Sequence, residues 1–194
     1  MALLLQTKPA AGPLRAGLRV HVLLVLVALV APGLASAKVL MTTAEALGHA
    51  FPGCTTTRRT LYPTPEQQAD IARRAGAPFD RAIIYLYQAD CGETGDGGVL
   101  LFDTHRVRTL EETLAIAINV DHTVRRVDVV SFREPEEYLL PEVWFNQFTG
   151  KALTADLAIG KSIRNMTGAS LSSRAAEAAI RRALAIVAVL GVTR

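Results

Sequence analysis

Residues 113–132 read TLAIAINVDHTVRRVDVVSF, and this stretch decides the fold class of the chain. Side-chain character alternates over residues 113–120 and again over residues 124–132, which is the period of a β-strand with one buried face. Asp121-His122-Thr123 between the two runs indicates a hairpin turn. Because strands joined by so short a turn pair antiparallel, the stretch predicts a β-hairpin.

Further strands and helices are expected on both sides of this hairpin. Runs rich in β-branched and aromatic residues predict strands over residues 54–61, 81–89 and 99–107. Start and stop signals predict helices over residues 42–51, over residues 66–74 with Thr64 as the cap, and at the C-terminus after Ser170. Sequential strands with flanking helices are typical of an α+β fold, here a mainly antiparallel sheet with flanking helices and a C-terminal helix.

The first 37 residues differ in kind from the rest. Three basic residues precede an apolar run over residues 20–30, and Ala35-Ser36-Ala37 then supplies the small residues of a cleavage site. The run is shorter than the ~20 residues of a membrane-spanning helix. We therefore expect residues 1–37 to be a signal peptide cleaved after Ala37, with retention as an N-terminal anchor as the alternative. Residues 38–194 then form one domain.

The basic pI near 9.1 does not indicate a nucleic-acid partner. Three of the 21 Lys and Arg residues lie in residues 1–37 and no acidic residue does, so residues 38–194 hold 18 basic and 18 acidic residues. No basic stripe is interleaved with aromatic residues, and we expect no nucleic-acid binding. Four arginine pairs have the pattern of solvated surface: Arg58-Arg59, Arg73-Arg74, Arg125-Arg126 and Arg181-Arg182.

Several other residue types could carry chemistry, and each also has an ordinary structural explanation. Cys54 and Cys91, the only cysteines, can pair in an oxidising compartment, which we favour over two separate buried thiols. His105 is interpreted as a satisfied or surface histidine, as are His49 and His122. The acidic residues near the end of the hairpin are interpreted as a solvated turn: Glu134, Glu136 and Glu137. Four aromatic residues are interpreted as core residues, although they could instead stack on the isoalloxazine ring of a flavin: Trp144, Phe145, Tyr85 and Tyr87.

Thr167-Gly168-Ala169-Ser170 lies just ahead of the expected C-terminal helix. Gly168 allows backbone angles closed to other residues, and Ser170 offers a hydroxyl nucleophile that must be activated from outside. Ser172 and Ser173 are the expected N-cap residues. A hydroxyl directly before a helix N-terminus can belong to a phosphate site, because free backbone N–H groups and the helix dipole favour an anion there, or can belong to a plain helix cap.

The same four residues resemble the Ser/Thr-Gly-Ala-Thr/Ser signature of the FMN-binding domain family. That family includes the peripheral flavoprotein subunits of the Rnf and sodium-translocating quinone reductase complexes. Blocks at residues 102–109, 120–124, 132–135 and 144–151 resemble the same family in the same order. The family usually has an acidic residue three places before the signature, where this chain has Arg164.

The resemblance implies that Ser170 carries FMN through a phosphoester bond, with Thr167, Gly168 and Ala169 as the neighbouring cofactor-binding residues. It implies an exported electron carrier more than a stand-alone enzyme, periplasmic or attached to the outer face of the inner membrane. The expected partners are a flavin transferase and redox proteins of the membrane or periplasm. The alternative is a secreted binding or adaptor domain of the same fold that carries no covalent flavin. We expect no metal site, because no histidine pair has ligand spacing.

Overall fold

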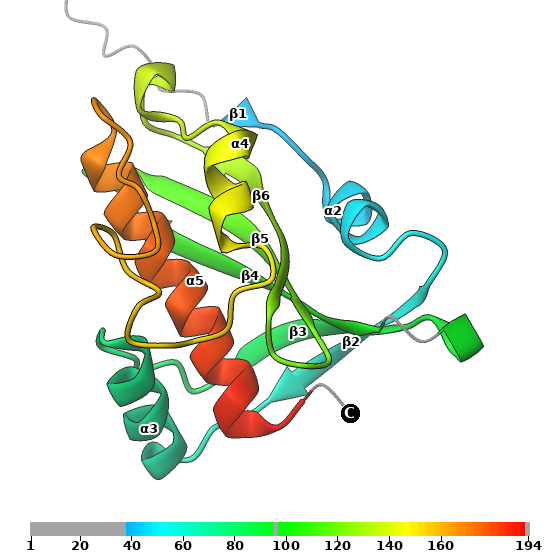
Figure 1. Cartoon of the computed structure of the whole chain (residues 1–194). Coiled ribbons are helices and arrows are strands. Elements are labelled where there is room, and N and C mark those ends of the chain that lie inside the picture. Colours follow the sequence, from blue (N-terminus) through cyan, green and yellow to red (C-terminus); the bar gives the residue numbers. More distant parts are fainter. Residues whose placement is uncertain (1–37, 95–96, 193–194) are drawn as a thin grey trace, which may run out of the picture. The chain divides into compact units, whose positions relative to one another are not determined.

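The protein is described here from a computed structural model, over residues 38–94 and 97–192. Six strands form one antiparallel sheet in the order β1-β6-β5-β4-β3-β2 (Figure 1). The strands are β1 (Lys38–Val39), β2 (Thr55–Leu61), β3 (Ile84–Asp90), β4 (Gly98–Arg106), β5 (Glu111–Asn119) and β6 (Val124–Phe132). With the helices described below, this arrangement confirms the predicted α+β fold. The expectations for residues 1–37 lie outside the described residues.

The hairpin predicted from residues 113–132 is present as β5 and β6. Its turn closes with the Asn119 N–H donating to the Thr123 carbonyl at 2.9 Å, and His122 adopts a positive φ of 65° there. The pairing is irregular at two places, between Thr113 and Leu114 and between Ala117 and Ile118. Such bulges increase the local twist of a sheet without changing which strands pair.

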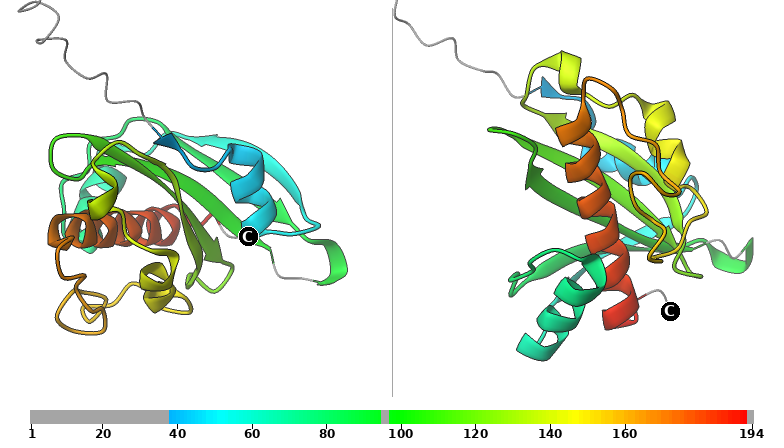
Figure 2. Two further views of the ribbon diagram at one scale, coloured as in Figure 1. Left: turned by 90° about the horizontal axis from the view of Figure 1, so that it is seen from above. Right: turned by 60° about the vertical axis from the view of Figure 1, so that its left-hand side comes forward.

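Helices cover both faces of the sheet. α5 (Ser170–Leu190) and α3 (Pro65–Ala75) cover one face, and α2 (Thr43–Ala50) lies on the opposite side (Figure 2). The larger hydrophobic core lies under α5 and α3, where Leu114, Ile116 and Ile118 of β5 are fully buried. The smaller core lies under α2 and contains Ala115 and Ala117 of the same strand. The prediction of one buried face is therefore wrong for β5, because the strand packs against a core on each side of the sheet and both of its faces are buried.

The two shorter helices begin where the sequence indicated. Thr42 caps α2 in a capping box with Glu45, and Thr64 caps α3 in a capping box with Gln67. In such a box the threonine side chain accepts from an unpaired N–H of the first turn, while the Glu or Gln side chain accepts from the N-cap backbone. α3 ends at Gly76, whose φ of 73° places it in the left-handed region that favours glycine.

The segment between β6 and α5 leads the chain to the expected attachment residues. It contains the short helices η2 (Glu136–Tyr138), α4 (Glu142–Phe145) and η3 (Asn146–Phe148). Trp144 is buried, and its indole Nε1–H donates to the Arg164 carbonyl at 2.8 Å. The side-chain oxygen of Gln147 accepts from the Arg164 N–H at 2.9 Å. The chain just before Thr167 is thus held by two side chains from this segment.

β3 and β4 pair over only part of their lengths. Their register runs from Leu86 opposite Leu101 to Ala89 opposite Gly98. Beyond Leu101, β4 continues to pair with β5 as far as Arg106, while β3 pairs with β2 as far as Ile84. The two strands therefore diverge at this end of the sheet.

Within the described residues, no helix is both long and apolar enough to cross a membrane.

Cys54 and Cys91 form a disulfide, as favoured from the sequence, with the short helix η1 (Gly92–Thr94) following Cys91. The bond lies next to the first residue pair of β2 and β3, Thr55 opposite Asp90. Disulfides persist in oxidising compartments and are rare in the cytosol, so the bond accords with an exported protein.

Replacing both cysteines by serine is expected to lower the free energy of unfolding by about 2–4 kcal/mol, because the bond closes a loop with a sequence separation of 37 and restricts the unfolded chain. Urea denaturation of wild type and double variant would measure this. A reductant should lower wild-type stability to that of the variant and leave the variant unchanged. Equal stabilities under oxidising conditions would contradict the disulfide.

Candidate functional site

Ser170 is the first residue of α5, and Ala169 is its N-cap. The prediction that the helix starts after Ser170 is therefore wrong by one residue. The predicted N-caps Ser172 and Ser173 are also wrong, because both lie inside the helix and are buried. Ser172 donates its hydroxyl to the Tyr138 carbonyl at 2.6 Å, and Ser173 donates to the Ala169 carbonyl at 3.1 Å. Small hydroxyl residues of this kind can satisfy backbone carbonyls at a tightly packed helix start.

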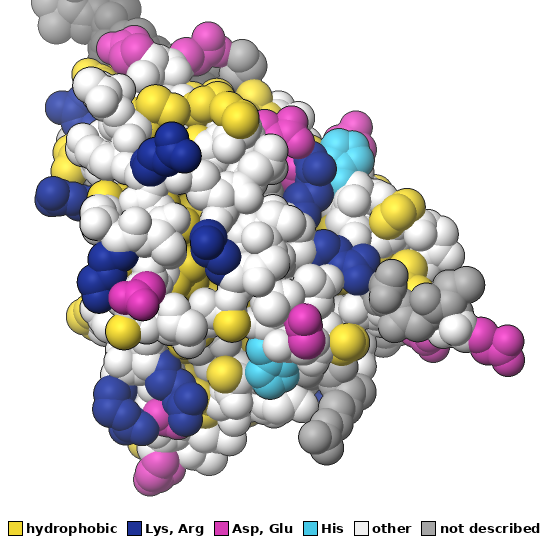
Figure 3. Space-filling model, viewed as in Figure 1, with side chains coloured by type: hydrophobic (Ala, Val, Ile, Leu, Met, Phe, Trp, Pro, Cys, Tyr) yellow, Lys and Arg dark blue, Asp and Glu magenta, His cyan; other side chains and the backbone are white. Residues whose placement is uncertain are grey.

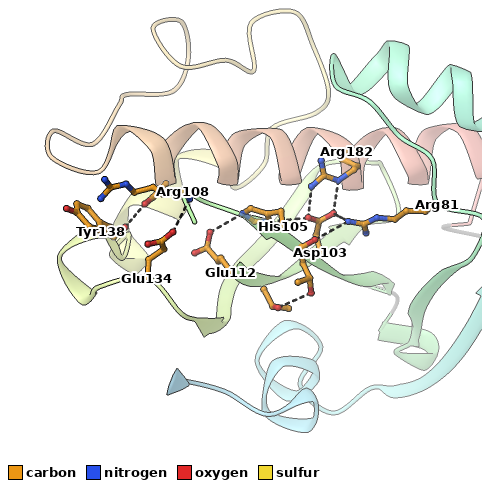
Figure 4. A network of polar contacts seen from close by, with 11 residues as sticks. Arg81, Asp103, His105, Arg108, Glu112, Glu134, Tyr138 and Arg182 are labelled. Atoms are coloured by element: carbon orange, nitrogen blue, oxygen red, sulfur yellow. Dashed lines mark hydrogen bonds and ion pairs between the residues drawn. The ribbon is translucent and has the colours of Figure 1, made fainter. Parts of the chain in front are cut away.

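Ser170 opens onto a cavity of about 290 Å³. The other lining residues are Arg108, Tyr138, Gly168, Leu171 and Ser172. The Arg108 guanidinium lies over the Tyr138 ring, 4.6 Å from its centre. In Figure 4 these two side chains lie beside the first turns of α5. Arg108 and the first residues of α5, Ser170 among them, thus border the same space.

The four residues of the signature have different positions. Gly168 has a φ of 87°, and a Cβ added there would meet no atom within 4 Å, so the backbone angle rather than crowding requires glycine. Ala169 is buried, whereas Thr167 is exposed and does not line the cavity. Of the four predicted residues, only Gly168 and Ser170 border the cavity.

Hydrogen bonding leaves donors available at this helix end. The Ser170 hydroxyl accepts from the Asn165 side-chain amide at 2.8 Å. The backbone N–H groups of Ser170, Leu171 and Ser172 find no acceptor among the described residues, as is usual in a first helical turn. Free N–H groups and the helix dipole favour an anion at this place.

Glu134 positions the loop that carries Arg108. One oxygen of its carboxylate accepts from the backbone N–H groups of Arg108, Thr109 and Leu110, at 3.1, 2.6 and 2.8 Å. Burial alone would raise the pKa of Glu134, but these hydrogen bonds outweigh it and lower the pKa. The prediction of a solvated acidic turn is therefore wrong for Glu134, which is 8% exposed, and is confirmed for the exposed Glu136 and Glu137.

A network of buried charges lies between α5 and the sheet (Figure 4). Asp103 accepts two hydrogen bonds from the Arg182 guanidinium, at 2.6 and 2.8 Å. The His105 ring lies between two carboxylates, with Nδ1 3.2 Å from Asp103 and Nε2 3.1 Å from Glu112. Arg81 reaches Asp103 at 3.3 Å. His105 is thus a satisfied, largely buried histidine with a side chain 10% exposed, whereas the prediction of a solvated face is wrong for Arg182.

The network sets the protonation of its members. Burial would raise the pKa of Asp103, but hydrogen bonds from Arg182 and His105 and the charges of Arg182 and Arg81 lower it to about 2. The ordinary pKa of an aspartate is 3.8, so the lowered pKa of Asp103 means that its ionised form stabilises the folded state by about 2 kcal/mol above pH 4. This stabilisation is lost as the pH falls towards 2. Burial would lower the pKa of His105, but hydrogen bonds to Asp103 and Glu112 and their charges raise it above 6.5.

One atom of the network is left over. The Glu112 side chain is fully buried, and its Oε1 has no hydrogen-bond partner among the described residues. A buried polar atom without a partner costs free energy, so this end of the network is less stabilised than the Asp103 end.

Within the described residues, no group of three or more His, Cys, Asp or Glu side chains is placed to hold a metal ion.

The aromatic side chains divide between the core and another cavity. Trp144 and Phe145 are buried core residues, as the core interpretation predicted. Tyr85 is 49% exposed, so the core interpretation is wrong for it. Tyr85 and Tyr87 border a cavity near the divergence of β3 and β4, and neither borders the cavity that contains Ser170. Arg108 and Tyr138 were not identified from the sequence as site residues.

Comparisons of the chain with protein-family models, with curated proteins and with solved structures find no match. The geometry described above is therefore the only structural support for a function.

His105→Gln is expected to destabilise the protein more at pH 6 than at pH 9. A pKa raised in the folded state gives stability that is fully present below the unfolded pKa of about 6.5 and is lost as the pH rises through the folded pKa. The facing charged groups are Asp103, Glu112 and Arg182. Urea denaturation across this pH range would measure the difference. The exposed His49→Gln serves as control, and a His105→Gln effect that does not shrink with pH would contradict a protonated His105.

Proposed function

We propose that this protein is an extracytoplasmic electron carrier with FMN attached through a phosphoester to Ser170. The observation that carries the proposal is the shared space at the start of α5. There Arg108 and the residues Ser170, Leu171 and Ser172 of the first turn border one cavity. This donor set suits a phosphate group, and it lies at the residue that the family signature indicates.

The phosphate end of FMN fits the residues that are present. A phosphodiester keeps one negative charge, which Arg108 can neutralise and the helix dipole stabilises. Gly168 leaves the approach open, since no atom lies where a side chain at that position would begin. Exposed Thr167 does not obstruct the cavity.

The cavity is at the small end of the sites that enclose a ligand. Its volume of about 290 Å³ is just below the ~300–1,000 Å³ of sites that enclose a ligand. The isoalloxazine ring is therefore expected to extend from the cavity towards solvent, where a redox partner can reach it. When bound, FMN supplies the electron-transfer chemistry, and the protein supplies placement and electrostatics.

Attachment requires a second protein. The Ser170 oxygen forms a bond to the FMN phosphorus while the P–O bond to the activating group of the flavin donor, a nucleotide in a flavin dinucleotide, breaks and that nucleotide leaves. A base must accept the proton of the Ser170 hydroxyl. Within the described residues, the only side chain hydrogen-bonded to the Ser170 hydroxyl is Asn165, which is not a base. A flavin transferase is therefore proposed to supply the activated FMN phosphate and the base.

The proposed place of action is outside the cytoplasm, in the periplasm or at the outer face of the inner membrane. The Cys54–Cys91 disulfide supports an oxidising compartment. The proposed partners are redox proteins of the membrane or periplasm. On the face drawn in Figure 3, Lys and Arg side chains lie scattered among uncharged and acidic ones, without one large basic patch.

A second candidate function rests on Arg164. This exposed residue stands where the family usually has an acid, and its backbone is fixed by Trp144 and Gln147. A transferase that needs an acid at this place would not modify the chain. The protein would then be a secreted binding or adaptor domain without covalent flavin.

Ser170→Ala is expected to abolish the attachment of FMN. Co-expression of the exported protein with a flavin transferase should give wild type a mass increase of one FMN less one water and in-gel flavin fluorescence after denaturation. Thr43→Ala is the control, because it removes an exposed hydroxyl from α2, on the opposite side of the sheet, and should leave the adduct in place. A wild type that stays unmodified would favour the adaptor function, and an adduct on Ser170→Ala would place the attachment elsewhere.

Arg108→Gln is expected to slow the attachment about tenfold, because a charge-assisted contact to the phosphate is lost. The initial rate of adduct formation, followed by intact mass, measures this effect. Arg106→Gln removes the same charge from the exposed end of β4, outside the cavity, and should not change the rate. Equal rates for both variants and wild type would exclude Arg108 as a phosphate ligand.

A further inference from the structure

The divergence of β3 from β4 creates a second cavity, of about 310 Å³. Leu101, Ala183 and Ile186, which belong to the core under α5, form part of its wall. Tyr87 and Phe102, which pack against the core under α2, form another part. The cavity therefore lies where the sheet is interrupted and touches both cores.

Aromatic and cationic residues both line this cavity. The Arg58 guanidinium lies over the Tyr85 ring, 4.3 Å from its centre, and the Tyr87 and Phe102 rings meet edge to face at 5.9 Å. Tyr85 is half exposed, so its ring is available to a ligand. Flat, partly exposed rings that line a cavity favour a planar aromatic ligand.

The charges at this cavity have a positive excess. Asp103 is the only carboxylate of the lining, and Arg182 already holds it through two hydrogen bonds. Arg81 contacts Asp103 and donates to the Thr104 carbonyl at 3.2 Å. Arg58 forms no ion pair with a described residue. Two guanidinium groups thus border a space whose one carboxylate is already neutralised.

We propose that this cavity binds a small planar aromatic anion. The ring would stack on Tyr85 and Phe102, and its anionic substituent would lie between Arg58 and Arg81. A guanidinium group binds a carboxylate through two parallel hydrogen bonds, so an aromatic carboxylate is the ligand class that suits the site best.

The site is independent of the flavin proposed at Ser170. Ala183 lies about 20 Å further along the axis of α5 than Ser170, at 1.5 Å per residue. The two cavities share no lining residue. Ligand binding is therefore expected in unmodified protein and in Ser170→Ala alike, which separates this proposal from the function proposed above.

The test uses 2-naphthoate as the probe and the purified, unmodified protein. Titration followed by ¹H–¹⁵N NMR should shift the amide signals of Tyr85, Tyr87 and Phe102 in a saturable way. Arg58→Gln should weaken binding about tenfold, since it removes an exposed charge-assisted contact. Arg59→Gln is the matched control, because its side chain lines a different cavity and bonds Gln88, and it should leave the affinity unchanged.

A neutral analogue, 2-naphthalenemethanol, should bind at least about tenfold more weakly than the carboxylate. Saturable binding of naphthoate that is weakened by Arg58→Gln alone would support the site. Three results would overturn it: no saturable shift up to about 10 mM probe, shifts confined to residues outside the cavity, or equal affinities for the charged and neutral compounds.

Discussion

The attachment of α5 to the rest of the molecule is the constraint on which the other features depend. Two adjacent arginines make it. Arg182 binds Asp103 of β4 with both donors of its fork, and Arg181 donates to the carbonyls of Ala75 and Leu157, at the end of α3 and in the loop before α5. Much of the helix face that packs on the sheet is alanine, which fills space but specifies rotation and axial position poorly. A buried ion pair with fixed geometry can supply that specificity, and here it sets which residues of α5 face which cavity.

The same constraint places Ser170. Because Arg182 fixes the helix against β4, the first turn of α5 falls beside the loop that follows β4, and that loop carries Arg108. Glu134 then holds the loop through three backbone N–H groups, and Ser172 ties the helix to Tyr138. Three segments far apart in sequence thus meet at one cavity through hydrogen bonds to backbone groups, which tolerate little displacement.

The structural features that the sequence predicted correctly depend on residues that are close together along the chain. The capping boxes at Thr42 and Thr64 and the hairpin at residues 113–132 are local patterns, and the structure contains each of them. The pairing of Cys54 with Cys91 was favoured because the sequence indicates export to an oxidising compartment and contains no other cysteine. Arg182, Glu134 and Arg108 were missed because their partners are distant in sequence. Only Arg182 gave a usable signal: it lies three residues after Ala179 and four before Ile186, both buried, so it falls beside the apolar face of the helix.

An electron carrier has to hold its cofactor at a fixed place and still present it to a partner. The start of α5 can meet both demands. Its backbone position is set by a helix with ten buried residues, while its first turn borders an open cavity of about 290 Å³. A noncovalent flavin would need a deep pocket to supply its binding free energy, and the cavity at Ser170 is too small for that. A covalent bond removes this need, because it retains the cofactor without enclosing it. Under the proposed function a tethered carrier does not need a cavity that encloses the flavin, so the size of this cavity is compatible with that function.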